Sequence, residues 1–217
     1  LVAAGGTIQL SGFDISTISA STLDVLDGGQ ATLSGVSILN TSGRVRLTCA
    51  AMLRGCNPPV LSVQGNSQLN IGDNLLLDGT VTVQVGSTAM VNLAGNFDNQ
   101  SGSPNLFNWA SSPITLNGMA PQSFEMAGQD FLDSNPAGFI NNFAMGTVRV
   151  EQGRTVNFNN NFDNLPGAGC EVLYVDTLVL EAGSTINLNG CNVYYRQRDQ
   201  HPSAIVNLNG GELKSAL

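Results

Sequence analysis

A short pattern of apolar and polar positions recurs along the chain. Each copy has an apolar residue, any residue and a second apolar residue, followed by a small residue or Asn and usually by Gly. The alternation has a period of two, which is typical of strands with one buried face and not of helices. The copies begin at Ile8, Ala31, Leu69, Val91, Ile114, Val156, Ile186 and Val206.

The spacing of these copies predicts a coil of about 21 residues. Their starting positions differ successively by 23, 38, 22, 23, 42, 30 and 20. We interpret the steps of 38 and 42 as two coils each, one of them degenerate. The step of 30 requires a loop insertion, and the Pro- and Gly-containing residues 165–169 are its predicted place.

A second half-pattern precedes several copies and completes the predicted unit. Leu178-Val179-Leu180 leads to Gly183 and then to Ile186, and Val148-Arg149-Val150 leads to Gly153 and Val156 at the same spacing. Each unit is therefore strand, Gly turn, strand and Asn/Gly turn. Gly and Asn suit such corners because they tolerate left-handed backbone conformations.

These repeats predict an all-β parallel β-solenoid of about ten coils, because stacked units bury a continuous apolar column that one unit cannot bury alone. A right-handed β-helix is favoured, since the hexapeptide repeat of left-handed β-helices is absent. The alternative is a β-sandwich, which does not need apolar residues in register every 21 positions. We expect one domain over residues 1–217, which could be an excerpt or processed piece of a longer surface protein.

Composition narrows the possible partners. The 217 residues carry 8 basic and 16 acidic side chains, a formal net charge of −8. Nucleic acids and anionic membranes require a dense Lys/Arg face, so neither is expected as a partner. No apolar run is long enough to span a bilayer. The 24 Asn residues predict Asn ladders at the corners of stacked coils.

The four cysteines predict two disulfides and an oxidising compartment. They form no CxxC pair and accompany a single His, so neither a zinc site nor any other metal or cofactor is expected. Cys170 and Cys191 are one predicted coil apart, a separation that a disulfide tolerates. Cys49 and Cys56 enclose a short loop and form the second predicted pair. The alternative is four buried thiols.

Candidate chemistry is sparse. Asn96-Phe97-Asp98-Asn99 and Asn161-Phe162-Asp163-Asn164 are twin motifs, and the predicted period places them about three coils apart. Three coils would separate them by about 14 Å, too far for a glycosidase pair, so we expect each Phe to fill the core and each Asp or Asn to cap a turn. Arg196, Arg198 and Tyr195 are weak candidates for binding an acidic glycan. No catalytic constellation is recognisable, so no enzyme activity is expected.

Two segments resemble large secreted bacterial surface proteins whose β-helical repeats are similar to those of autotransporter passengers. They are residues 170–195, which include EAGSTINLNG at 181–190, and residues 116–125, LNGMAPQSFE. The likeness covers about residues 80–210 and, more loosely, the rest. It implies a right-handed β-helix on or outside the cell, and it implies no catalytic residues.

The expected function is therefore an extracellular structural module, acting as a surface rod, an adhesin or a filament subunit. Ile8 and Leu10 near one end, and Val206 and Leu208 near the other, belong to ordinary repeat strands. A bare solenoid end exposes strand edges, so we expect end-to-end self-association or pairing with neighbouring repeats of a longer chain. The alternative is a β-helix that binds or cleaves an extracellular polysaccharide.

Overall fold

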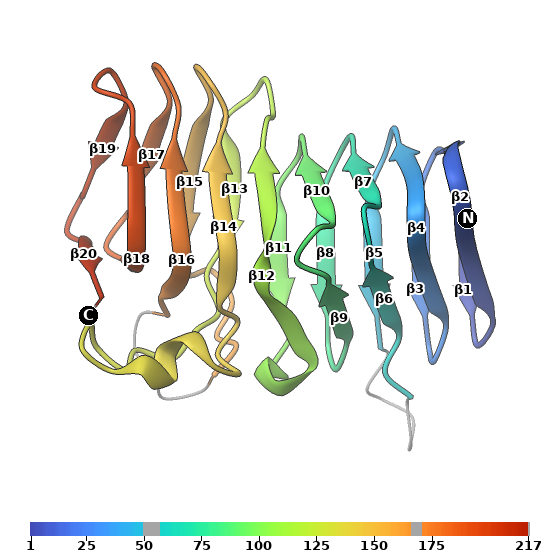
Figure 1. The fold of residues 1–217 in the computed structure, drawn as a ribbon. Coiled ribbons are helices and arrows are strands. Elements are labelled where there is room, and N and C mark those ends of the chain that lie inside the picture. The colour runs from blue at the N-terminus through green and yellow to red at the C-terminus, as the bar shows by residue number, and fades with distance from the viewer. Residues whose placement is uncertain (50–56, 166–170, 217) are drawn as a thin grey trace.

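The computed structural model describes residues 1–49, 57–165 and 171–216. Its strands form two sheets that run side by side along the molecule, and every strand-to-strand pairing in them is parallel (Figure 1). The predicted parallel β-solenoid is confirmed. The antiparallel pairings of a β-sandwich are absent from the strands that the structure describes.

Sheet A has nine strands, one for each coil. In spatial order they are β1 (Val2–Ala4), β3 (Leu23–Leu26), β5 (Val45–Thr48), β8 (Leu75–Asp78), β11 (Phe97–Gln100), β13 (Gln122–Glu125), β15 (Thr155–Asn159), β17 (Thr185–Asn187) and β19 (Ile205–Asn207).

Sheet B has eleven strands, because some coils contribute one long strand and others two short ones. They are β2 (Thr7–Ala20), β4 (Gln30–Thr41), β6 (Val60–Val63), β7 (Gln68–Ile71), β9 (Thr82–Val85), β10 (Met90–Leu93), β12 (Phe107–Leu116), β14 (Met145–Val150), β16 (Leu173–Leu180), β18 (Asn192–Gln200) and β20 (Glu212–Ser215). β4 pairs with β2 on one side and with both β6 and β7 on the other.

The strand register measures the length of each coil. Two residues aligned on neighbouring strands of sheet A are one coil apart along the chain. Such pairs are Val2–Asp24, Asp24–Arg46, Arg46–Leu76, Leu76–Asp98, Phe97–Phe124, Phe124–Phe158, Val156–Ile186 and Ile186–Val206. In this order, their residue numbers differ by 22, 22, 30, 22, 27, 34, 30 and 20. The predicted period near 21 therefore describes the short coils. The longer ones carry extra residues between strands, which a solenoid accommodates at its corners without disturbing the register.

The prediction of two degenerate coils is wrong. Ala31 aligns with Leu61, whereas Leu69 aligns with Leu39 of the same strand β4, so the step from 31 to 69 joins neighbouring coils. The step from 114 to 156 crosses from sheet B to sheet A, where the last three copies of the pattern lie. The same short pattern suits both sheets because both have one buried face.

Aligned apolar side chains form the core. One column runs through Leu23, Val45, Leu75, Phe97, Phe124 and Phe158, all of them buried. The Phe97 and Phe124 rings are stacked with centroids 4.7 Å apart, and the Phe124 and Phe158 centroids are 5.3 Å apart. Such pairs add to the stabilisation that burial alone provides.

Asn residues form the expected ladders, but mostly on the outer faces of strands and not at the corners. Asn70 donates to Asn40 at 2.6 Å and accepts from Asn92 at 2.7 Å, which links β4, β7 and β10. A second ladder links Asn157, Asn187 and Asn207 on sheet A. Strand faces carry these ladders because parallel register places like residues one strand spacing apart. At the corners, Asn189 and Asn209 adopt positive φ and are joined at 3.4 Å.

A long excursion between β13 and β14 covers part of the outer face of sheet B. It contains the 3-10 helix η2 (Pro136–Phe139), seen in yellow beside β16 in Figure 1. Tyr174 of β16 and Tyr194 of β18 point outward yet are buried beneath it, and their hydroxyls bond to Leu132 O and to Asp130. The other 3-10 helix is η1 (Pro104–Leu106). Within the described residues, no helix has the length and apolar character needed to cross a membrane.

Truncation of Phe124 to Ala should lower the free energy of unfolding by about 3–5 kcal/mol, because it leaves a cavity between two other aromatic rings. Urea unfolding followed by circular dichroism measures the loss. The control is Ile140→Ala, because that side chain is 65% exposed and its truncation should change stability by less than about 0.5 kcal/mol. Equal losses in the two variants would contradict the stacked core.

Substitution of Asn70 by Ala should cost about 1–2 kcal/mol, because it removes the middle member of a three-residue ladder and leaves the side-chain amides of Asn40, Asn92 and Gln68 without this partner. The control is Asn207→Ala, since Asn207 lies at the exposed end of the other ladder and, among the described residues, its side chain bonds only to Asn187. Thermal and urea unfolding of both variants measure the difference. A loss at position 207 as large as that at 70 would show that ladder position does not matter.

Candidate functional site

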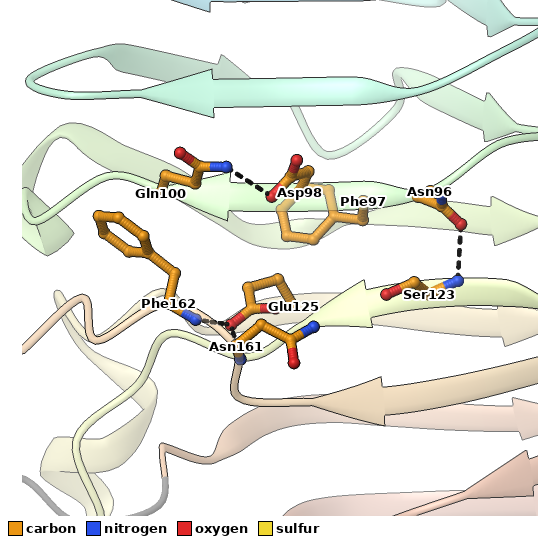
Figure 2. Close-up of a pocket in the computed structure, with 8 residues that line it drawn as sticks. All are labelled: Asn96, Phe97, Asp98, Gln100, Ser123, Glu125, Asn161 and Phe162. Carbon is orange, nitrogen blue, oxygen red and sulfur yellow. Dashed lines mark hydrogen bonds between the residues drawn. The ribbon is translucent and has the colours of Figure 1, made fainter.

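A pocket of about 310 Å³ opens on the outer face of sheet A. β11 and the residue before it contribute Asn96, Phe97, Asp98 and Gln100, β13 contributes Ser123 and Glu125, and the segment after β15 contributes Asn161 and Phe162. Figure 2 shows these side chains converging from three successive coils.

Strand alternation aims two carboxylates at this pocket. Phe97 and Phe124 are aligned on neighbouring strands and point into the core. The residues that follow them, Asp98 and Glu125, therefore point outward side by side. Asp98 accepts a hydrogen bond from the Gln100 amide at 3.1 Å and is half-buried.

Glu125 is held beneath the segment that follows β15. The residue is only 4% exposed, and its Oε1 accepts hydrogen bonds from the backbone N–H groups of Asn161 at 2.6 Å and Phe162 at 2.8 Å. Burial raises the pKa of Glu125 above its ordinary value, and the negative charge of Asp98 adds to the rise, whereas the two backbone donors oppose it. Phe162 remains 41% exposed at the mouth of the pocket.

The twin motifs meet, contrary to the expected separation of three coils. β13 alone lies between β11 and β15 in sheet A, and the segment after β15 folds back toward β11. The Asn164 amide donates to Asn99 O at 3.0 Å and to Ser101 O at 2.7 Å. Phe97 fills the core as predicted, but the prediction that Phe162 does so is wrong, because Phe162 belongs to a corner segment and not to a strand.

Glu125 lies outside the twin motifs, although the sequence carries a signal for it. Phe97-Asp98, Phe124-Glu125 and Phe162-Asp163 are all an aromatic residue followed by an acidic one. The first two occupy equivalent strand positions, so their acidic residues become neighbours. This signal is visible only after the strands are aligned.

A second buried carboxylate, Glu171, lies near this region. It is fully buried, and its Oε1 accepts a hydrogen bond from the Leu165 N–H at 2.8 Å. Burial raises the pKa of Glu171 to about 7, and the charges of Asp163 and Glu125 contribute further, against the lowering effect of backbone donors. The two glutamates thus hold a corner segment, residues 161–165, through backbone N–H groups.

The residues proposed to bind an acidic glycan lie together on β18 but are engaged within the protein. Arg196 forms an ion pair with Asp176, and its guanidinium carbon lies 3.9 Å from the centroid of Phe139. Tyr195 packs against the core, and the Arg198 guanidinium lies over its ring at 5.3 Å. These contacts leave no open aromatic platform on β18.

The predicted disulfides each include a residue outside the described part of the chain, namely Cys56 or Cys170. Cys49 and Cys191 are both buried, and they are not joined to each other. Near Cys191 the coil is slightly shorter than the predicted period, because Leu173 aligns with Val193. Both pairings stay predictions.

The predicted end residues lie in the outermost strands or, for Leu208, directly after one. Ile8 and Leu10 belong to β2 at one edge of sheet B and pack against the core while remaining half-exposed. Val206 belongs to β19 at the opposite end of sheet A, and Leu208 directly follows that strand and is exposed. Across the described ranges, no three His, Cys, Asp or Glu residues come close enough together to hold a metal ion.

No protein family model, no curated protein and no solved structure matches this chain. The function must therefore be argued from the geometry.

Replacement of Glu171 by Gln should remove a pH-dependent loss of stability. The pKa of this carboxyl rises from 4.5 to about 7 on folding, so the folded state favours the neutral form and the wild type loses stability as the pH rises from 4.5 to about 7. Gln stays neutral and can still accept the Leu165 N–H bond. The variant should match the wild type below pH 4.5 and exceed its stability by about 3 kcal/mol above neutrality.

Urea unfolding over a series of pH values tests this expectation. Asp199→Asn is the control, because Asp199 is an exposed carboxylate of β18 and its loss should leave the pH profile unchanged. A Glu171→Gln profile parallel to that of the wild type would contradict the assigned burial effect.

Proposed function

We propose that this chain is a structural module of an extracellular β-solenoid rod, and that copies of it associate end to end. The observation that carries the proposal is the uninterrupted core, in which buried apolar side chains follow one another through the strands of sheet A and the paired strands of sheet B. A body whose one continuous core runs through nine stacked strands of sheet A suits a spacer or a filament subunit.

The outermost coils supply the surfaces for association. β1 pairs only with β3, and β19 pairs only with β17, so among the described strands each has one edge of backbone N–H and C=O groups without a strand beside it. Val2 of β1 is 63% exposed and Ile205 of β19 is 52% exposed. A second copy placed in register would pair the backbone edges and cover these side chains.

The extracellular setting rests on sequence observations. The cysteines are suited to an oxidising compartment, and residues 170–195 resemble bacterial surface proteins. The same resemblance supports a rod or adhesive role over an enzymatic one. The candidate glycan-binding residues of β18 give less support to the polysaccharide alternative, because Arg196 already pairs with Asp176 and Phe139.

Sedimentation velocity and negative-stain electron microscopy test the proposal. The wild type should form head-to-tail oligomers whose size grows with concentration, whereas Val2→Lys and Ile205→Lys should shift the population to monomers by placing a charge on each edge. Met90→Lys adds the same charge at an exposed apolar site of β10, a strand with a paired neighbour on each side, and it should associate like the wild type. A wild type that stays monomeric at every concentration would overturn end-to-end association.

A further inference from the structure

We propose that the pocket formed by β11, β13 and residues 161–162 binds a sugar unit that carries a protonated amine. This function is separate from the structural role proposed above. β11 is the fifth of the nine strands of sheet A, so the pocket lies far from both outermost coils.

The pocket has the dimensions and lining of a small-ligand site. Its volume of about 310 Å³ lies at the lower end of the range for ligand pockets, about 300–1,000 Å³, and suits one or two sugar rings. The lining combines an aromatic ring with amides, a hydroxyl and two carboxylates.

The two carboxylates make the pocket negatively charged. No Lys, Arg or His is among the residues that line the pocket. The negative charges of Asp98 and Glu125 therefore repel each other, and no cationic side chain of the lining offsets that repulsion. Oε1 of Glu125 is occupied by two backbone donors, whereas its Oε2 takes no hydrogen bond from any described residue. Oε2 is not among the fully buried polar atoms, so it is accessible from the pocket, and an ammonium group placed there would supply both charge and hydrogen bonds.

The remaining lining residues suit the rest of a sugar ring. Figure 2 shows the Phe162 ring and the Gln100 amide at one end of the Asp98–Glu125 pair, and Asn96 and Ser123 at the other. The exposed face of an aromatic ring packs against the apolar face of a sugar, and it also attracts a nearby cation. Gln100 Oε1 and the Asn96 side-chain nitrogen form no hydrogen bond with described residues, so they can meet hydroxyl groups.

The same features argue against the acidic polysaccharides considered for β18. A uronate or sulfate group in this pocket would lie beside two carboxylates, and like charges at this distance repel strongly when they are partly desolvated. A simple capping role for Asp98 would not explain the hollow or the exposed Phe162, because a turn cap needs neither.

Isothermal titration with two matched oligosaccharides tests the proposal. The whole 217-residue chain is titrated near neutral pH with a glucosamine oligomer and with its N-acetylated counterpart, which has the same rings and linkages but no charge. The glucosamine oligomer should bind at least about tenfold more tightly, as expected for a charge-assisted contact. Equal binding of the two, or no binding of the glucosamine oligomer, would overturn the proposal.

Spermidine is the third ligand, and spermidine bound as tightly as the glucosamine oligomer would also overturn it, by showing that the amine alone is recognised.

Variants then locate the site. Asp98→Asn and Glu125→Gln should each weaken binding of the glucosamine oligomer about tenfold, and Phe162→Ala should weaken it several-fold. Asp199→Asn and Ile140→Ala are the controls, because they remove one negative charge and one exposed apolar side chain elsewhere and should bind like the wild type. Gln at 125 keeps an acceptor for the two backbone N–H groups, and an unchanged circular dichroism melt confirms that the variants are folded. Binding that survives all three pocket substitutions would place it elsewhere and reject the site.

Discussion

The in-register stacking of apolar side chains on successive parallel strands is the constraint on which the rest of this structure depends. One stacked column consists of Leu23, Val45, Leu75, Phe97, Phe124 and Phe158. Each strand adds its apolar side chain to this column only in that register. Because strand side chains alternate between faces, the same register also aligns the outward residues. The Asn ladders and the Asp98–Glu125 pair are both consequences of the core.

Outward stacking has opposite effects for amides and for carboxylates. An amide both donates and accepts, so Asn40, Asn70 and Asn92 satisfy one another along their ladder. Two ionised carboxylates on neighbouring strands only accept hydrogen bonds, so they cannot bond to each other, and burial makes their repulsion stronger. Glu125 is tolerated because the segment after β15 directs two backbone N–H groups at it.

Departures from the short coil create every irregular feature described on the surface. The excursion between β13 and β14 carries η2 and buries Tyr174 and Tyr194, and residues 160–165 fold back to form one wall of the pocket. A solenoid accepts such additions because each strand contacts only its neighbours. The regular coils are thus alike along the molecule, whereas the longer coils build its pocket and its covered sheet face.

The sequence by itself determined the all-β class, the parallel coiling and much of the core, including Phe97, because a period-two pattern repeated at near-constant spacing has few other ways to bury its apolar face. It also indicated Asn ladders, although their position on strand faces was not foreseen. Only the tertiary structure decided which copies of the pattern share a sheet, that the twin motifs meet, and that Glu125 lies beside Asp98 while Phe162 stays exposed. The physical reason is that the alternation of a strand is a local property of the sequence. The path of a corner segment depends instead on its length and on the hydrogen bonds that it can form with backbone and side-chain groups after the coils have stacked.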